Sequence, residues 1–386
     1  MKDYNNKEIK IGDPDWNALR DQFPVTRNFI YFNHAAIAPI SLIVKEQINE
    51  CTEKYCTNGI VCNSEYLDIA DRARLLAAQL INAKFSEIAF IKNTTQGIQI
   101  AANGIRWQSG DNILIPVNEF PANVFPWLNL AKKGVEVRFI PTKDGRFTAG
   151  EIAKYIDKRT RALSVSAVSF TNGFRCNLTE IGQLCKDMGI FFNVDAIQAL
   201  GAVDIDVRQS KIDLLSADAH KWLLGPQGIG IVFISESMLE NLDVSNLGYK
   251  SMNEESDYLN YNIRLKSNAS RFEEGTLNIF GIVGLKASLE MLLSIGIPMI
   301  ESRLLELTNL LVQSLTEQSY IIRSFMNDNE RSGILSFHHK KYSTDTIYQH
   351  LLKAGVVCAR RDGAVRLSPH FYNNYEDIDL CVKALP

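Results

Sequence analysis

Residues 213–234 read DLLSADAHKWLLGPQGIGIVFI, and they predict two short apolar strands joined by a turn. Gly225 and Pro226 mark the turn, and Lys221 lies just before it. A lysine is usually a solvated surface charge, yet this one stands in an apolar, glycine-rich stretch. Burial lowers the pKa of an ammonium group and frees the amine as a nucleophile. The stretch therefore predicts a buried, reactive lysine.

Outward from this stretch, the chain alternates apolar strands with amphipathic helices, which is typical of an α/β domain with a mostly parallel sheet. The predicted strands are 87–92, 112–117, 135–140, 162–168, 190–195, 213–218 and 228–234, with helices at 95–105, 125–134 and 179–189. After about Gly281 long helical stretches lead into shorter strands, a pattern that predicts a smaller α+β domain. We expect residues 51–281 to form the large domain and 282–386 the small one, which residues 1–50 join.

Composition narrows the class of protein. The 386 residues are 46% hydrophobic and 22% charged, with a net charge of −3, as in an ordinary globular protein. No basic run suggests nucleic acid, and no apolar stretch approaches the roughly 20 residues that cross a bilayer. The polar start lacks the apolar core of a signal peptide, so we expect a cytoplasmic protein with no membrane partner. Three of the seven cysteines cluster in CTEKYCTNGIVC (51–62), which lacks a zinc-site spacing, so we predict no metal and no disulfide framework.

Two further segments place polar groups at the carboxyl ends of predicted strands, where open α/β sheets bind ligands. Asp195 ends the strand of FFNVDAIQALG, and Gln198 follows on the first helical turn. A helix N-cap would also explain the aspartate. In IKNTTQGIQIAANGI, Thr94 and Thr95 begin a helix whose first amide groups predict a site for a phosphate. Capping alone would explain the threonines as well.

The ordered set of a phosphate-binding helix start, an aspartate at a strand end and a lysine 26 residues later resembles the class V aminotransferase family. This family belongs to the pyridoxal 5'-phosphate (PLP) enzymes of fold type I and includes cysteine desulfurases, kynureninases and isopenicillin N epimerases. The resemblance extends from YFNHAAIAPIS (31–41) to SPHFYNN (368–374). It implies a large domain with a seven-stranded, mostly parallel sheet, a smaller α+β domain and PLP as the cofactor.

The resemblance also implies a role for individual residues. Lys221 would form the Schiff base with PLP and move the α-proton of an amino acid bound as an external aldimine. Asp195 would pair with the pyridine nitrogen, which keeps the ring an electron acceptor. The other implied contacts are with the ring hydroxyl (Gln198), the phosphate (Thr94, Thr95 and His220), the partner subunit's phosphate in a homodimer (Thr276), the substrate carboxylate (Arg366) and the substrate (Asn33 or His34).

The chain departs from the desulfurases in several places. Where they stack a histidine on the PLP ring, NEFPANVFPW (118–127) offers Phe120, as in kynureninase-like members, although core packing would also account for it. The run GVVCARRDGAVRLS (355–368) leaves almost no room for a loop with a nucleophilic cysteine, so Cys358 is expected to be buried. Phe170 replaces an asparagine near the ring hydroxyl, and Asp218 places a carboxylate near the phosphate, which it would repel unless compensated.

These features lead to three functional expectations. The first is an amino-acid enzyme of the isopenicillin N epimerase-like branch. Proton return to Cα, proton return to the cofactor and loss of a β-substituent all use the same residues, so these residues do not choose among epimerisation, transamination and elimination. The second is a carbon–sulfur lyase or desulfurase-like enzyme without a loop persulfide. The third, from another class, is a PLP-binding protein without catalysis.

Overall fold

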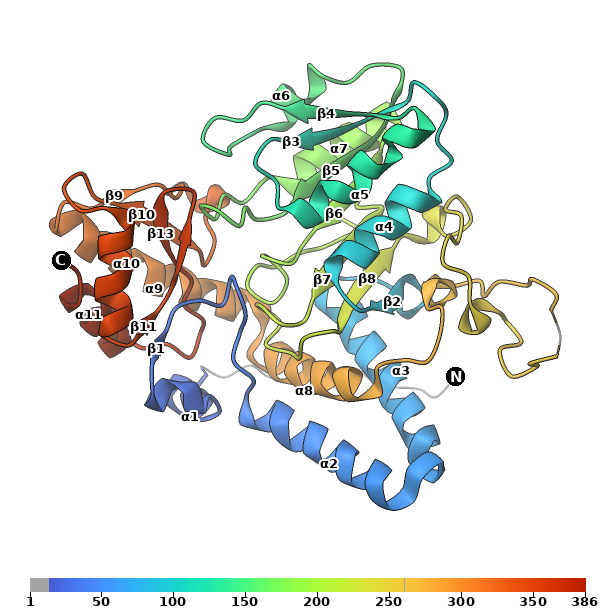
Figure 1. Ribbon diagram of the computed structural model, residues 1–386, viewed down its shortest axis with the longest axis horizontal. Helices are drawn as coiled ribbons and strands as arrows, with labels where there is room; N and C mark the ends of the chain where they lie inside the picture. Colours follow the sequence, from blue (N-terminus) through green and yellow to red (C-terminus); the bar gives the residue numbers. More distant parts are fainter. Residues whose placement is uncertain (1–13, 260) are drawn as a thin grey trace.

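A seven-stranded sheet forms the centre of the protein in the computed structural model, which describes residues 14–259 and 261–386 (Figure 1). Along the sheet the strands follow the order β2-β8-β7-β6-β5-β3-β4. They are β2 (Ile88–Ile91), β3 (Asn112–Pro116), β4 (Glu136–Ile140), β5 (Thr160–Ser166), β6 (Phe191–Asp195), β7 (Leu214–Asp218) and β8 (Gly230–Ile234). Strands β3 to β7 are parallel, and β8 runs antiparallel to both of its neighbours. This arrangement confirms the predicted α/β class and the mostly parallel sheet.

Helices cover both faces of this sheet because its strands alternate apolar side chains between the two faces. In β8, Ile231 and Phe233 join the core that includes α3 (Asn63–Leu80), α7 (Leu178–Met188) and α8 (Ile279–Ile295). Val232 and Ile234 join the opposite core, with α4 (Thr94–Gly104) and α5 (Phe125–Leu128). The sheet is thus buried on both faces. Ligands can approach it at the carboxyl ends of its parallel strands.

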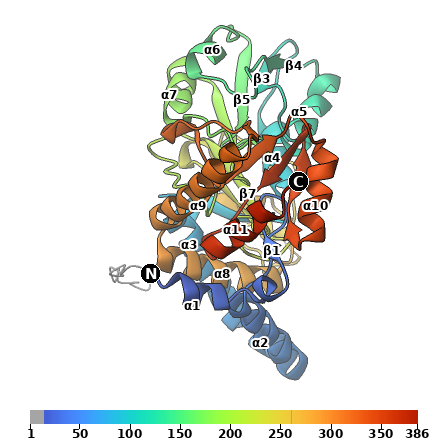
Figure 2. The same cartoon turned by 90° about the vertical axis from the view of Figure 1, so that its left-hand side faces the viewer.

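A second, four-stranded antiparallel sheet lies toward the C-terminus, on the left in Figure 1 and facing the viewer in Figure 2. Its order is β12-β13-β10-β9, with β9 (Ile321–Ile322), β10 (Leu335–His338), β12 (Ala359–Arg361) and β13 (Ala364–Leu367). The accompanying helices are α9 (Ile297–Glu317), α10 (Thr344–Lys353) and α11 (Tyr375–Lys383). The predicted division between the two domains, after residue 281, lies inside helix α8. The structure shows no break in the chain at that point, and the division stays a prediction.

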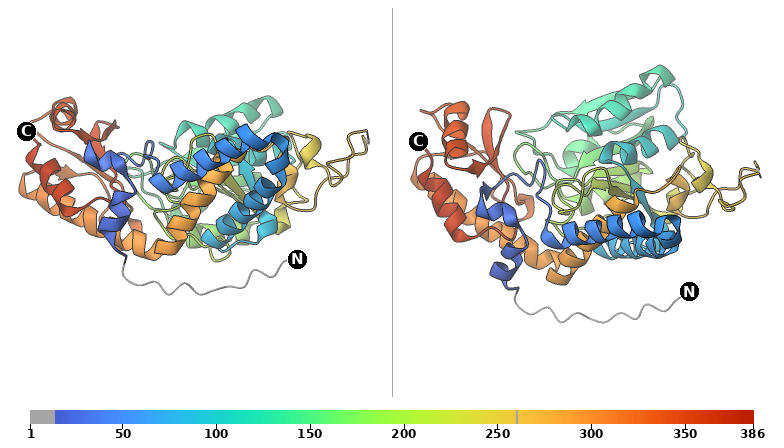
Figure 3. Two further views of the ribbon diagram at one scale, coloured as in Figure 1. Left: turned by 90° about the horizontal axis from the view of Figure 1, so that it is seen from below. Right: turned by 60° about the horizontal axis from the view of Figure 1, so that its bottom comes forward.

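The beginning of the described chain contacts both sheets. Strand β1 (Ile30–Tyr31) pairs in parallel with β11 (Val356–Val357) as a separate two-stranded sheet, and the next residue, Phe32, joins the core of the four-stranded sheet. Helix α1 (Trp16–Asp21) lies beside the C-terminal helix, as Figure 3 shows. Helix α2 (Leu42–Asn58) packs instead along α3 and α8. Part of the predicted segment 1–50 thus contacts the second sheet and part contacts the helices of the first, while residues 1–13 lie outside the described residues.

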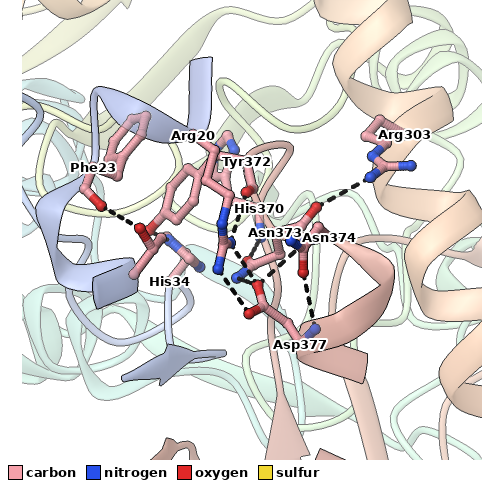
Figure 4. A network of polar contacts seen from close by, with 10 residues as sticks. Arg20, Phe23, His34, Arg303, His370, Tyr372, Asn373, Asn374 and Asp377 are labelled. Carbon is pink, nitrogen blue, oxygen red and sulfur yellow. Dashed lines mark hydrogen bonds and ion pairs between the residues drawn. The ribbon is translucent and has the colours of Figure 1, made fainter. Parts of the chain in front are cut away.

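A buried polar network fastens α1 to the C-terminal segment (Figure 4). The Arg20 guanidinium lies 2.7 Å from the Asp377 carboxylate and also donates to the Tyr372 carbonyl. Asn373 donates to the same carboxylate at 2.9 Å. Such a network holds the segment just after Arg366 in one position, since a buried charge pair is costly to break.

Over the described residues, no single helix is both long enough and apolar enough to cross a membrane. Helices α8 and α9 meet that criterion only as a pair, and the pair is bent by 79°.

Candidate active site

Lys221 lies in the turn between β7 and β8, as the sequence predicts, and is only 8% exposed. Its amine makes no hydrogen bond or ion pair with any residue that the structure describes. Burial lowers the pKa of this lysine to about 8, against a smaller opposing effect of Asp195. About a tenth of the amine is therefore unprotonated at pH 7, far more than for a solvated lysine, as suits a Schiff-base lysine.

Two carboxyl groups stand at the ends of neighbouring parallel strands, next to the lysine. Asp195 ends β6, and one of its oxygens accepts from the Ile197 amide at 3.0 Å. Burial raises its pKa to about 6, and the charge of Lys221 opposes that rise. Asp218 ends β7, and burial raises its pKa to about 7. Since Asp195 pairs with Ser216 across the two strands, both carboxyls belong to one edge of the sheet.

The N-terminus of α4 meets these carboxyls. Asn93 caps the helix by accepting from the Gln96 amide at 2.9 Å, and the Thr94 hydroxyl accepts from the Asp218 amide at 3.1 Å. Gly97 allows this close approach, because a Cβ there would come within 2.4 Å of the Cβ of Ser216. The first amide groups of the helix, at Thr94 and Thr95, thus lie beside the lysine turn, where they suit a phosphate.

Asp218 lies next to the predicted phosphate site, where the sequence indicates that its charge would need compensation. Its Oδ2 lies 3.4 Å from Nδ1 of His220, and its buried Oδ1 has no partner in the described structure. Burial lowers the pKa of His220 to about 4, so this imidazole is neutral. A carboxyl whose pKa is about 7 is protonated half of the time at neutral pH, which weakens its repulsion of a phosphate.

Gln198 and Phe120, the two residues predicted to contact the cofactor ring, differ in burial and in their contacts. The Gln198 side chain is buried, accepts from the Trp222 indole at 3.0 Å and donates to the Ala35 carbonyl at 2.9 Å. One amide hydrogen remains for the predicted ring-hydroxyl contact. Phe120 is 41% exposed, and the Lys221 amine lies 5.6 Å from the centroid of its ring. Its predicted stacking on the cofactor stays a prediction.

The predicted substrate-binding residues come from two segments that pair with each other, since Asn33 pairs with Ser368, two residues after Arg366. Arg366 in β13 is 1% exposed, and its Nη1 donates to the Phe170 carbonyl at 2.5 Å. Its Nε and Nη2 are buried without a partner among the described residues. Burial lowers its pKa to about 9, because the guanidinium loses water and no carboxylate of the described residues pairs with it. Two free N–H groups on one guanidinium match the two oxygens of a carboxylate.

Asn33 and His34 differ in what they can still bind. The His34 ring is fully buried between the Ser368 carbonyl, 2.8 Å from Nδ1, and the Tyr372 hydroxyl, 2.5 Å from Nε2. Because Nδ1 must donate to the carbonyl, Nε2 of this neutral ring accepts from the tyrosine. The Asn33 Oδ1, by contrast, is buried with no partner in the described part of the chain. This arrangement favours Asn33 over His34 for contact with a substrate.

Thr276 lies apart from the lysine of its own chain. Its hydroxyl is 3.2 Å from the Tyr249 hydroxyl, in an exposed position. With Gln96 and Asn278 it lines a cavity of about 220 Å³ between the end of β2 and the start of α8. Its predicted contact with a partner subunit is not tested by a single chain.

Together these groups fit PLP and its substrate. The amine of Lys221 suits the aldehyde, the buried carboxyl of Asp195 suits the pyridine nitrogen, and the α4 N-terminus suits the phosphate. The unpartnered guanidinium nitrogens of Arg366 suit the carboxylate of an amino acid. Among these groups, the Lys221 amine and the Arg366 Nε and Nη2 atoms are buried and have no partner in the described residues, which leaves them available to a ligand.

Two charged residues of this site, Glu119 and Arg361, were not expected from the sequence. Glu119 accepts from the amide of Ser166 at 2.6 Å and from its hydroxyl. Burial raises the pKa of this glutamate to about 7, helped by the charge of Asp195. Arg361 lies near enough to Lys221 and Arg366 for its charge to lower the pKa of both. The sequence offered one signal for each residue. Glu119 comes just after a predicted strand, and Arg361 precedes the turn-forming pair Asp362-Gly363.

Comparisons with known proteins agree with this site. The family model described as Aminotransferase class-V matches residues 30–381. A probable cysteine desulfurase of Methanothermobacter thermautotrophicus is 30% identical over 95% of this chain and 96% of its own. A cysteine desulfurase of Salmonella newport is 30% identical over 82% and 81% of the two chains.

The fold is also similar to solved structures. The apo structure of the cysteine desulfurase from Thermococcus onnurineus NA1 superposes with a TM-score of 0.87 at 26% identity, over 98% of each chain. The match of the family model covers the lysine, both carboxyls and the arginine described above. The protein therefore belongs to the class V aminotransferase family of PLP-dependent enzymes.

Proposed function

We propose that this protein is a PLP-dependent carbon–sulfur lyase that acts on a cysteine derivative. This is the second of the functions expected from the sequence, and it replaces the epimerase-like one. The names of the similar proteins support it, because desulfurases break a carbon–sulfur bond of cysteine. The observation that carries it is that the Lys221 amine faces the phenyl ring of Phe120.

The phenyl ring matters because it cannot exchange a proton. Inversion at Cα by two bases needs a proton donor on the face opposite the first base. Elimination needs only one base, which takes the α-proton and hands it to the departing sulfur. Lys221, with its pKa lowered to about 8, is suited to both of these transfers. With Phe120 stacked on the cofactor face opposite Lys221, as proposed, that face offers no proton donor and the site favours elimination over inversion.

The chain's own residues divide the remaining work. Bound PLP supplies an electron sink for the charge that develops at Cα. Arg366 holds the substrate carboxylate with its two free N–H groups and so fixes the orientation of the Cα–H bond. Asp195 holds a proton on the pyridine nitrogen, because its ionised form gains a cationic partner there.

Sulfur leaves this site as a free thiol. Cys358 lies between β11 and β12, is 5% exposed, and has a pKa that burial raises to about 12. Cys358 is thus buried, as expected from the sequence, and such a thiol is a poor nucleophile. The balanced reaction consumes the cysteine derivative and one water and releases the thiol RSH, pyruvate and ammonia.

A homodimer is part of the proposal. Apolar side chains stand exposed on the segment before Thr276: Tyr258 is 72% exposed, Leu259 85% and Tyr261 86%. In Figure 1 this segment extends away from the body of the protein. A second copy that covers these side chains would bury apolar area and receive Thr276 at its phosphate site.

The test is to incubate the purified, PLP-loaded protein with cysteine, cystine and S-substituted cysteines and to measure pyruvate and released thiol. We expect both products in equal amounts from the wild-type protein and neither from Lys221→Ala. Appearance of the D-amino acid without pyruvate would restore the epimerase hypothesis. A cofactor absorption band that no amino acid changes would instead indicate a PLP-binding protein without catalysis.

A further inference from the structure

A short hairpin at the substrate end of the site carries two arginines on one face. Strands β12 and β13 pair so that Ala359 is opposite Arg366 and Arg361 is opposite Ala364. Opposite residues in an antiparallel pair point to the same side, and so do residues two apart along a strand. Arg361 and Arg366 therefore share a face, diagonally placed with roughly 7–8 Å between their backbones. Only the methyl groups of the two alanines complete that face.

Arg361 has no carboxylate partner in the described structure. Its one recorded hydrogen bond runs from Nη1 to the Arg360 carbonyl at 2.7 Å, and its side chain is half-buried. The neighbouring Arg360 points to the other face, where it pairs with Asp345 and lies 4.7 Å from the ring of Tyr348. One arginine of the hairpin is thus neutralised by the protein itself, and the other is not.

The charge of Arg361 is directed at the active site. Arg361 shares a hairpin face with Arg366, and its charge lowers the pKa of both Arg366 and Lys221. The carboxyls of Asp195 and Asp218 stand at the opposite, cofactor side, at the ends of β6 and β7. Arg366 is matched by the carboxylate that every amino acid carries. The remaining donors of the half-buried Arg361 are available to a second anion.

We propose that Arg361 binds a second anionic group of the substrate, so that the preferred substrate is a cysteine derivative whose sulfur substituent ends in a carboxylate. This inference rests on the proposed lyase function for the position of the sulfur. Arg366 takes the α-carboxylate, and Arg361 takes the distal one beyond the sulfur. A planar guanidinium on a rigid hairpin suits that task because its donors are held in one orientation.

A matched pair of substrates tests this directly. S-carboxymethylcysteine carries the distal carboxylate, and S-carbamoylmethylcysteine has nearly the same shape without the charge. For each substrate, the dissociation constant is measured from the change in the cofactor's visible absorption and kcat/KM from pyruvate release. We expect the wild-type protein to prefer the charged substrate by about tenfold or more in both quantities, as for a charge-assisted hydrogen bond.

Three variants locate the preference. Arg361→Gln should reduce the ratio between the two substrates to near one, and Arg361→Lys, which keeps the charge but not the fork, should restore part of it. Arg360→Gln is the matched control, because it changes the other face of the same hairpin and should keep the wild-type ratio. An unchanged ratio in Arg361→Gln, or no preference in the wild-type protein, overturns the proposal.

The two readouts separate this proposal from the lyase function. If no sulfur compound yields pyruvate but the absorption titration still shows the Arg361-dependent preference, the lyase function fails and the second anion site stands. If pyruvate forms equally well from both substrates, the lyase function stands and the anion site fails.

Discussion

Replacing Lys221 by methionine should stabilise the cofactor-free protein at neutral pH. Methionine has nearly the length of lysine, fills the same apolar turn and carries no charge. In the wild-type chain the ammonium is buried without an ion pair among the described residues, and its pKa falls from 10.5 to about 8. The residue needed for chemistry is thus expected to weaken the fold that holds it.

The size of the effect follows from the pKa shift. A change from 10.5 to about 8 is about 2.5 units, which at 1.36 kcal/mol each amounts to about 3 kcal/mol. Below pH 8 both the folded and the unfolded chain carry the proton, so the whole penalty is present. Between about pH 8 and 10.5 the unfolded chain binds more protons, and the stability of the wild-type protein rises with pH. Above 10.5 the penalty is gone.

The assay is urea unfolding of both proteins, freed of PLP, at pH 7, 9 and 10.5 and one protein concentration. We expect Lys221→Met to raise the free energy of unfolding by about 3 kcal/mol at pH 7 and by progressively less toward pH 10.5. Lys132→Met, at an exposed position, is the control and should show no such trend. A Lys221→Met protein that is less stable than wild type at pH 7, or whose advantage does not fall with pH, would refute the reasoning.

Three further substitutions test the roles of single groups in the PLP-loaded protein. Asp195→Asn should lower the rate of pyruvate release by roughly a hundredfold while PLP remains bound, measured from product formation and cofactor content, because the pyridine nitrogen loses its carboxylate. Arg366→Gln should weaken amino-acid binding by about 10- to 150-fold in an absorption titration, since a charged hydrogen-bonded pair contributes about 1.5–3 kcal/mol; unchanged affinity would show that the carboxylate binds elsewhere. Cys358→Ala should leave the rate of thiol release unchanged, because the thiol is buried and its pKa is raised to about 12; loss of thiol release from a folded variant would reinstate a cysteine nucleophile.

The sequence was sufficient for the parts of the site that depend on strand ends. Asp195 and Asp218 end neighbouring apolar strands, and parallel strands bring their carboxyl ends to one edge whatever the details of packing. Lys221 was recognisable because a charge is rare in an apolar run between two strands.

Contacts between distant segments were out of reach. The Gln198 amide is held by Trp222 and Ala35, and the His34 ring by Ser368, which is 334 residues away. Nothing local to either residue encodes such a partner. Arg361 was missed for another reason, because its face depends on the register of a hairpin, and a slip of one residue would point it to the opposite side.

The pairing of the first strand with a late one bears on how the chain folds during synthesis. Phe32 provides the carbonyl that binds Ser368, and 336 residues separate the two. At the usual roughly 5–20 residues per second, the ribosome needs about 17–67 s to make that stretch. Phe32 and Phe23, both fully buried in the finished protein, lack their late partners Ser368 and Tyr372 throughout that interval. The segment around these two residues therefore completes its packing only after the C-terminal segment has been made, and a chaperone that shields it would act during that interval.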